Sequence, residues 1–246
     1  MQRDSTNYVL FFTMTMTVIV AVVLAGMYSS LKDIHTTNEQ NYNKKQILSS
    51  LDLAENFKAS EKADDEVASI FEKQVEGVVI NTAGETVEGR VAADVKMEKE
   101  EKKAEADRQY PVFKYKSDAG KEYYILSIRG NGLWDKIWGW VAIQNDERKT
   151  VVGAAFGHKG ETPGLGAEIK DNKTWQKQFA GSEASKLMLY SDAGTYQGLM
   201  VKKGGAQDKS YQVDGISGAT VTCDGVTEML ERGLAIYMPY LDSIKK

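Results

Sequence analysis

The sequence predicts an α+β protein: a single N-terminal transmembrane helix, followed by a soluble domain with a twisted, largely antiparallel sheet and packed helices. Three observations predict this class. A charge-free apolar run lies near the N-terminus. The spacing of apolar residues then changes from three or four, typical of helices, to short strand-like runs between turn sequences. With 42% hydrophobic and 27% charged residues among 246, the chain can bury a core and is not disordered as a whole.

The first predicted element is a membrane span. Residues 5–31 contain no Asp, Glu, Lys, Arg or His, and residues 8–27 are mostly apolar. A helix of that length crosses the roughly 30 Å hydrocarbon core of a bilayer once. A cleaved signal peptide has a shorter apolar core and a small-x-small site, which Ala25-Gly26 matches poorly. A retained anchor is therefore favoured, although the charges on its two sides do not orient it.

The segments that follow are predicted from hydrophobic spacing. We expect an anchor over residues 1–31, a helical connecting region over residues 32–76 and an α+β domain over residues 77–246. Within the domain, turn sequences and β-branched runs predict the following strands and hairpins: a strand at 78–80, hairpins at 112–129 and 137–156, and short strands at 187–190 and 199–202.

A charged run interrupts the predicted sheet. Eleven of the fifteen residues from Asp94 to Arg108 are charged, with both signs mixed. Such a run is typical of a solvated helix or an exposed loop. We assign it no chemistry.

The composition excludes several classes of protein. The chain has 31 Lys and Arg against 35 Asp and Glu, a net charge of −4, so it lacks the concentrated positive charge of a nucleic-acid-binding protein. A single cysteine excludes an internal disulfide framework. One cysteine and two histidines also exclude a Cys/His zinc site. We therefore expect no nucleic acid partner and no metal.

Two glycine-containing loops are the candidate sites. In the first, residues 158–166, Pro163-Gly164 suits the centre of a type II turn. In the second, residues 214–222, small residues stand directly before an amphipathic helix. That arrangement receives phosphate, because free N–H groups and the positive end of the helix dipole point there. From the spacing alone, ordinary turns explain both loops at least as well, and the second is neither a Walker A loop nor a dinucleotide fingerprint.

The sequence does not assemble a catalytic group from side chains. His35 and His158 lie far apart, which disfavours a Ser–His–Asp hydrolase. We expect His158 to be a polar loop residue. Cys223 is predicted to be a small buried residue at a helix start and not a redox centre. The chemistry is therefore expected to come from a bound cofactor.

The chain resembles a known family through its order of motifs. A membrane span is followed by Glu-Thr-Pro-Gly-Leu-Gly at 161–166 and by Ser-Gly-Ala-Thr at 217–220 before a C-terminal helix. This order resembles the C subunits of Na⁺-translocating NADH:quinone reductases, members of the covalent-FMN-binding domain family, over essentially the whole chain. The pattern Asp-x-x-Ser-Gly-Ala-Thr-x-Thr is specific, because the flavin transferase of the family recognises it.

The resemblance implies the cofactor and its site residues. In the family, FMN is joined covalently through its phosphate to the last Thr of Ser-Gly-Ala-Thr, which here is Thr220. The other residues that the resemblance places at the cofactor are Asp214, Ser217, Gly218, Ala219 and Thr222 of the acceptor motif, and Glu161, Thr162, Pro163, Gly164, Leu165 and Gly166 of the loop that lies against the flavin. The tryptophans, Tyr123 and Tyr124 are possible flavin neighbours, but we predict that they pack in the core.

The resemblance also implies a function and a location. We expect an electron-transfer subunit of a Na⁺-translocating NADH:quinone reductase that relays electrons between redox centres toward quinone, without oxidising NADH by itself. Its expected partners are the other membrane subunits, the flavin transferase during maturation, and membrane lipid. We expect a single-pass protein of the bacterial inner (cytoplasmic) membrane with its soluble domain on the periplasmic side. The alternatives are the G subunit of the related Rnf ion-translocating electron-transport complex and a cofactor-free, membrane-anchored binding module.

Overall fold

A computed structural model describes residues 5–147, 149–181 and 186–244 of the chain. The chain divides into two compact units, Met1–Tyr42 and Asn43–Lys246.

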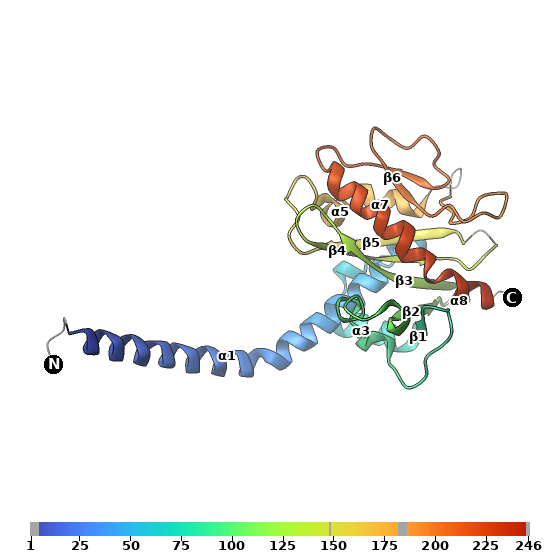
Figure 1. Ribbon diagram of the computed structural model, residues 1–246. Helices are drawn as coiled ribbons and strands as arrows, with labels where there is room; N and C mark the ends of the chain where they lie inside the picture. The colour runs from blue at the N-terminus through green and yellow to red at the C-terminus, as the bar shows by residue number, and fades with distance from the viewer. Residues whose placement is uncertain (1–4, 148, 182–185, 245–246) are drawn as a thin grey trace. The chain divides into compact units, whose positions relative to one another are not determined.

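The first unit consists mainly of residues 6–42 of helix α1 (Thr6–Ser49), and residues 43–49 of this helix are counted in the second unit (Figure 1). Within the described part of the chain, α1 is the one helix long and apolar enough to cross a membrane. Its apolar side chains between Val9 and Met27 are exposed. The Thr17 hydroxyl donates to the Thr13 carbonyl oxygen at 2.8 Å, so a polar residue in the apolar stretch is satisfied within the helix.

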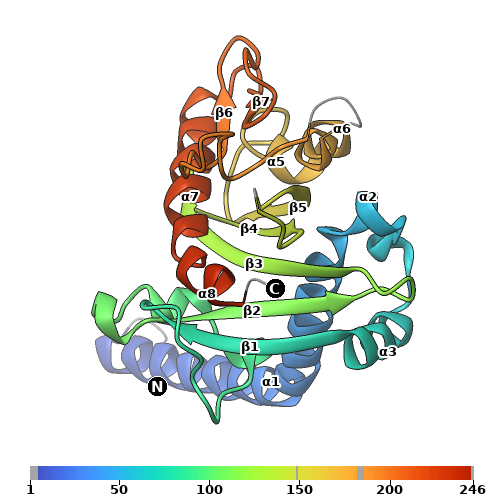
Figure 2. The same cartoon turned by 90° about the vertical axis from the view of Figure 1, so that its right-hand side faces the viewer.

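The second unit is built on a five-stranded antiparallel sheet with the strand order β1-β2-β3-β4-β5 (Figure 2). The strands are β1 (Val75–Asn81), β2 (Gln109–Lys116), β3 (Glu122–Asn131), β4 (Lys136–Ile143) and β5 (Val151–His158). The β2–β3 and β4–β5 hairpins confirm the two hairpins predicted from the sequence. The fold class predicted from the sequence is confirmed as well.

Both faces of the sheet are covered, which alternation along the strands makes possible. On one face, Tyr110, Val112, Leu126 and Ile128 belong to a core that includes α7 (Thr220–Ala235). On the other face, the side chains that alternate with these form a second core with the last turn of α1. The remaining helices are α2 (Asp52–Glu55), α3 (Asp64–Gln74), α4 (Met97–Glu100), α5 (Glu168–Asp171), α6 (Lys173–Gln176) and α8 (Met238–Ser243), with 3₁₀ turns at Ala59–Glu61, Ala92–Asp94, Glu105–Asp107 and Lys177–Ala180.

Helix α7 lies unusually close to strand β3, because glycines stand at the contact. A Cβ on Gly225 would lie 2.1 Å from the Asn131 carbonyl oxygen, and a Cβ on Gly233 would lie 2.8 Å from Ile128 Cγ2. Neither position has space for a side chain. The close approach fixes the first turn of α7 beside the turn that joins β3 to β4.

The segment predicted as a strand at 187–190 is not one. Residues of this segment make only isolated bridges, Thr150 with Met188 and Tyr190 with Tyr196. Leu187 and Leu189 are nevertheless buried, so their apolar side chains fill the core from an irregular segment. The predicted strand at 199–202 is confirmed as β6 (Met200–Lys202), which pairs in parallel with the unpredicted β7 (Gln212–Asp214).

The charged run is folded onto the sheet and is only partly solvated. The Glu100 side chain is buried, and its carboxylate accepts from the Lys103 ammonium at 2.7 Å and from the Gln109 backbone N–H at 3.1 Å. Glu101 pairs with Arg129 and Lys136, at 3.2 and 3.4 Å. The run therefore anchors the long β1–β2 connection, a structural role that its composition did not predict.

Candidate functional site

The two glycine-containing loops meet at one cavity of about 140 Å³, at the start of α7. Its lining residues come from the β3–β4 turn, from the loop after β5 and from the acceptor segment: Leu133, Glu161, Thr162, Leu165, Gly166, Gly218, Ala219, Thr220, Val221 and Thr222. The structure thus brings together eight of the twelve site residues named from the sequence. Ligand pockets are typically about 300–1,000 Å³. A cavity of this size therefore encloses only part of a ligand of the usual size.

The first loop is held by a turn of the predicted kind. The Leu165 backbone N–H donates to the Thr162 carbonyl oxygen at 3.1 Å, and Gly164 between them has a φ of 75°. Proline before such a glycine fixes the turn. The Pro163-Gly164 tip lies outside the cavity lining, whereas the residues on both sides of it line the cavity.

The second loop enters α7 through Gly218, whose φ is 77°. A Cβ there would lie 2.6 Å from Leu165 Cδ2 of the first loop, so glycine is needed both for the backbone conformation and for the contact between the loops. Helix α7 then begins at Thr220. The first backbone N–H groups of a helix have no partner inside it, and they carry the positive end of the helix dipole. The residues present therefore fit an anionic group such as a phosphate.

Three threonines line the cavity, and their hydroxyls differ in hydrogen bonding. The Thr222 hydroxyl is buried and donates to Glu161 Oε2 at 2.6 Å. Thr162 Oγ1 accepts from the Trp134 indole N–H at 3.1 Å. Among the described residues, no group pairs with the hydroxyl of Thr220, which is half-buried. Thr220 therefore presents the one hydroxyl of the three that is free to react.

Glu161 is a buried carboxylate with hydrogen bonds to both oxygens. Oε1 accepts from the Trp134 backbone N–H at 2.9 Å, and Oε2 accepts from Thr222. Burial opposes the charged form. Hydrogen bonds from Thr222 and from the backbone of residues 133–135 outweigh burial and hold the pKa of Glu161 below its ordinary value. Gly132 and Gly166 leave room for the carboxylate, since a Cβ on either would lie 2.5 or 2.4 Å from one of its oxygens.

Large apolar side chains are exposed at the cavity: Leu133 (52%), Leu165 (41%) and Val221 (52%) line it, and Trp134 (69%) donates to its lining residue Thr162. Such side chains on one rim indicate a ligand or an interface. The prediction that the tryptophans pack is therefore wrong for Trp134, although Trp140, Tyr123 and Tyr124 are buried as predicted. The signal in the sequence was the position of Leu133-Trp134 at a hairpin turn, from which side chains do not reach the core.

The other residues named from the sequence lie outside the cavity lining. Asp214 is exposed at the end of β7, and its carboxylate accepts from the Ala206 backbone N–H at 2.7 Å. Ser217 is exposed in the loop before α7. His158 is the last residue of β5, and its Nδ1 accepts from the Glu161 backbone N–H at 3.2 Å. Cys223 is buried as predicted, and burial raises the pKa of its thiol. The described residues contain no cluster of His, Cys, Asp and Glu that would hold a metal ion.

Comparison with known proteins agrees with this geometry. The FMN-binding domain family matches residues 132–235, a range that contains the whole cavity lining. The fold and the site thus define a protein with an FMN-binding domain. The chain is also 31% identical to the C subunit of the Na(+)-translocating NADH-quinone reductase of Neisseria meningitidis (strain MC58) over 265 residues, covering 99% of this chain and 96% of that protein. The chain belongs to the family of the C subunits of Na(+)-translocating NADH-quinone reductases.

Further relatives and solved structures carry the same name. The C subunit of the Chlamydia muridarum reductase is 44% identical over 139 residues, which is 51% of this chain and 42% of that protein. The crystal structure of the C subunit from Parabacteroides distasonis has a TM-score of 0.73 at 33% identity, covering 87% of this chain and 98% of that chain. Shewanella oneidensis NqrC has a TM-score of 0.66 at 27% identity, covering 84% and 99%. The predicted family is therefore confirmed and favoured over the Rnf alternative.

Proposed function

We propose that this chain is the flavin-carrying electron-transfer subunit of a Na⁺-translocating NADH:quinone reductase, with FMN joined through its phosphate to Thr220. The observation that carries the proposal is the Thr220 hydroxyl, which lies in a cavity at the start of a helix and has no partner among the residues that the structure describes. The family match supports FMN as the ligand. The names of the relatives support the assignment to the reductase complex. Within that complex, the chain relays electrons between redox centres toward quinone.

Different residues of the site contact the phosphate and the flavin ring. The Thr220 oxygen forms the ester, and the free N–H groups of the first turn of α7 stabilise the remaining negative charge. Gly218 and Ala219 place no bulk in the way of the phosphate. The exposed Leu133, Trp134, Leu165 and Val221 would cover part of the apolar flavin ring and exclude water from it. When bound, FMN supplies the one-electron and two-electron redox chemistry, and the protein sets its position and exposure.

The chain is not proposed to oxidise NADH by itself, because the sequence contains no dinucleotide fingerprint. Its function therefore depends on the other membrane subunits. We propose that purified, flavin-loaded chain gives no NADH oxidation above that of the unloaded chain in a spectrophotometric assay. Oxidation at a rate that increases with loading would contradict this part of the proposal.

Attachment at Thr220 is tested by mass. The full chain is co-expressed with the flavin transferase, and its intact mass is measured after denaturation. The wild-type mass is expected to increase by FMN minus one water, the T220A chain is expected to gain nothing, and T220S is expected to retain the gain because it keeps the hydroxyl. An unmodified wild-type chain, or a modified T220A chain, would overturn the attachment and would favour a cofactor-free anchored module.

The location of the domain is tested by labelling. We propose that α1 crosses the bacterial inner membrane once, that the second unit lies on the periplasmic side, and that lipid surrounds the span. Leu53 is exposed, whereas the native Cys223 is buried, so an L53C chain offers one accessible thiol. A membrane-impermeant maleimide is expected to label L53C in cells with a permeabilised outer membrane. Labelling only after lysis would place the domain in the cytoplasm.

A further inference from the structure

One buried carboxylate connects the three segments that form the flavin site. Glu161 belongs to the loop after β5. It accepts from the Trp134 backbone N–H in the β3–β4 turn and from the Thr222 hydroxyl in the first turn of α7. We propose that Glu161 is the positioning residue of the site: it holds the turn that carries the apolar rim and the helix start that carries Thr220 in the arrangement in which Thr220 accepts the flavin phosphate. The inference rests on the function proposed above.

The two carboxylate oxygens accept from different segments. Oε1 accepts from the Trp134 backbone N–H in the turn at 2.9 Å, and Oε2 accepts from the Thr222 hydroxyl in the helix at 2.6 Å. The Trp134 N–H needs an acceptor, and the Thr222 hydroxyl donates here because an ionised carboxylate offers acceptors only. A glutamine of the same size has one oxygen and one NH₂ group. Its oxygen can accept from the Trp134 N–H and its NH₂ group can donate to the Thr222 oxygen, but both hydrogen bonds then lose the charge of the carboxylate and become weaker.

The surroundings are built for this carboxylate. Glu161 is 4% exposed, and the glycines at 132 and 166 leave space that a single added methyl group would close. Gly132 belongs to the turn and Gly166 to the loop. The turn therefore offers the carboxylate both space and a donor, the loop offers it space, and the start of α7 offers it the Thr222 hydroxyl.

The same contact separates the two threonines of the acceptor motif. The Thr222 hydroxyl is occupied as a donor to Glu161, whereas the Thr220 hydroxyl at the cavity has no partner in the described part of the chain. In the transfer, a bond forms between Thr220 Oγ and the flavin phosphorus of a flavin dinucleotide. The phosphoanhydride bond of that donor breaks, the nucleoside monophosphate leaves, and the hydroxyl proton passes to the transferase or to water. Glu161 acts on this step only by holding the participants in place.

The test measures the rate of covalent flavin incorporation into the full chain in detergent, with purified transferase and flavin dinucleotide. Variants are compared at a temperature at which near-ultraviolet circular dichroism shows each to be folded. E161Q and T222V are expected to load about tenfold more slowly than wild type, because the first weakens two charge-assisted hydrogen bonds and the second removes one, and either change reduces the population of the competent arrangement. T222S keeps the hydroxyl and is expected to recover most of the rate lost in T222V.

A matched control separates positioning from stability. Glu100 is a second carboxylate that is equally buried, at 2% exposed, and its partners lie in the β1–β2 connection. E100Q is expected to lower the unfolding temperature but to load at the wild-type rate. Loading of E161Q at the wild-type rate, or loading of E100Q as slow as that of E161Q, would overturn the inference. T220A tests the underlying function separately: if T220A incorporates covalent flavin, the attachment site itself is wrong, whatever E161Q does.

Discussion

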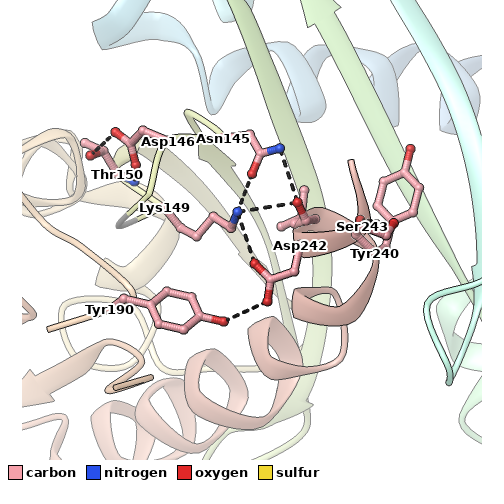
Figure 3. A network of polar contacts seen from close by, with 9 residues as sticks. Asn145, Asp146, Lys149, Thr150, Tyr190, Tyr240, Asp242 and Ser243 are labelled. Carbon is pink, nitrogen blue, oxygen red and sulfur yellow. Dashed lines mark hydrogen bonds and ion pairs between the residues drawn. The ribbon is translucent and has the colours of Figure 1, made fainter. Parts of the chain in front are cut away.

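The most specific stability prediction concerns the buried Lys149, which fixes the C-terminal helix α8 to the β4–β5 turn (Figure 3). The Lys149 side chain is fully buried. Its ammonium contacts Asn145 Oδ1 at 2.5 Å, the Leu241 carbonyl oxygen at 3.4 Å and Asp242 Oδ1 at 3.3 Å. The Tyr190 hydroxyl donates to the other oxygen of Asp242 at 3.4 Å. The Lys149 ammonium is thus removed from water, and among the described residues the Asp242 carboxylate is an opposite charge in contact with it.

The perturbation is D242N, which keeps the shape of Asp242 and removes its charge. Removing one partner of a fully buried ion pair costs about 3–5 kcal/mol, because the other charge remains buried and uncompensated. The Asp242 side chain is 43% exposed and Asn keeps one acceptor, so we expect a smaller loss, about 1–3 kcal/mol. K149M removes the buried charge together with its contacts, and we expect it to destabilise the fold by about 1–2 kcal/mol.

The double variant K149M/D242N is the one that tests the reasoning. Because K149M removes the uncompensated ammonium that D242N creates, K149M/D242N is expected to be at least as stable as D242N alone, with a coupling of about 1–3 kcal/mol. Thermal unfolding of the full chain in detergent, followed by near-ultraviolet circular dichroism, measures this at roughly 2–4 °C per kcal/mol. Lys149 has a φ of 52°, and Met at this position keeps the same backbone strain. A double variant less stable than D242N would refute the reasoning.

Buried side chains on and near α7 give three further predictions. Y237F removes a hydroxyl that donates to the Ser127 carbonyl oxygen at 2.6 Å, so it should cost about 1–3 kcal/mol in denaturant unfolding; a neutral effect would contradict this. Because hydrogen bonds hold the pKa of Glu161 below 4.5, its charged form stabilises the fold above that pH, and this contribution is lost as the pH falls through the lowered pKa. The difference in unfolding free energy between wild type and E161Q should therefore narrow on acidification, and a widening difference would count against it. Since burial shields Cys223 and raises the pKa of its thiol, iodoacetamide should label it only at the rate of unfolding, and rapid labelling of native chain would disprove this.

Hydrophobic spacing was sufficient to predict the sheet, because each hairpin is local. Residues 112–129 and 137–156 place alternating apolar residues on both sides of short turn sequences, and these strands pair as expected. The same spacing failed at residues 187–190. Two leucines there are buried without a neighbouring strand, and burial alone produces the pattern of a strand. Strand β7, at Gln212–Asp214, was missed because it is only three residues long, is mostly polar, and pairs in parallel with the preceding strand β6, so it forms no hairpin.

The positions of the two motifs in the sequence were predictable, but the contact between them in the folded chain was not. Nothing local in the sequence says that Thr222 donates its hydroxyl to Glu161, because the two residues are 61 positions apart. The same holds for the buried Glu100. Within a charged run every carboxylate looks solvated, and only the fold selects the one that is surrounded by donors. Trp134 was misjudged for the opposite reason, since aromatic residues are usually buried and this one lies on a turn.

The charge of the cavity gives a physical reason for the covalent attachment proposed above. Among the described residues that line it, the ionisable one is Glu161, which is negative, and no lysine or arginine is present. The start of a helix contributes about 0.3–1 kcal/mol to an exposed anion, whereas micromolar binding requires about 8 kcal/mol. A deep pocket would supply the difference by burying the flavin ring, but it would also separate the ring from its electron donor and acceptor. The cavity here is small and its apolar rim is exposed, which suits a ring that stays accessible. The proposed ester to Thr220 would keep the cofactor at such a site without requiring the affinity that the lining residues do not provide.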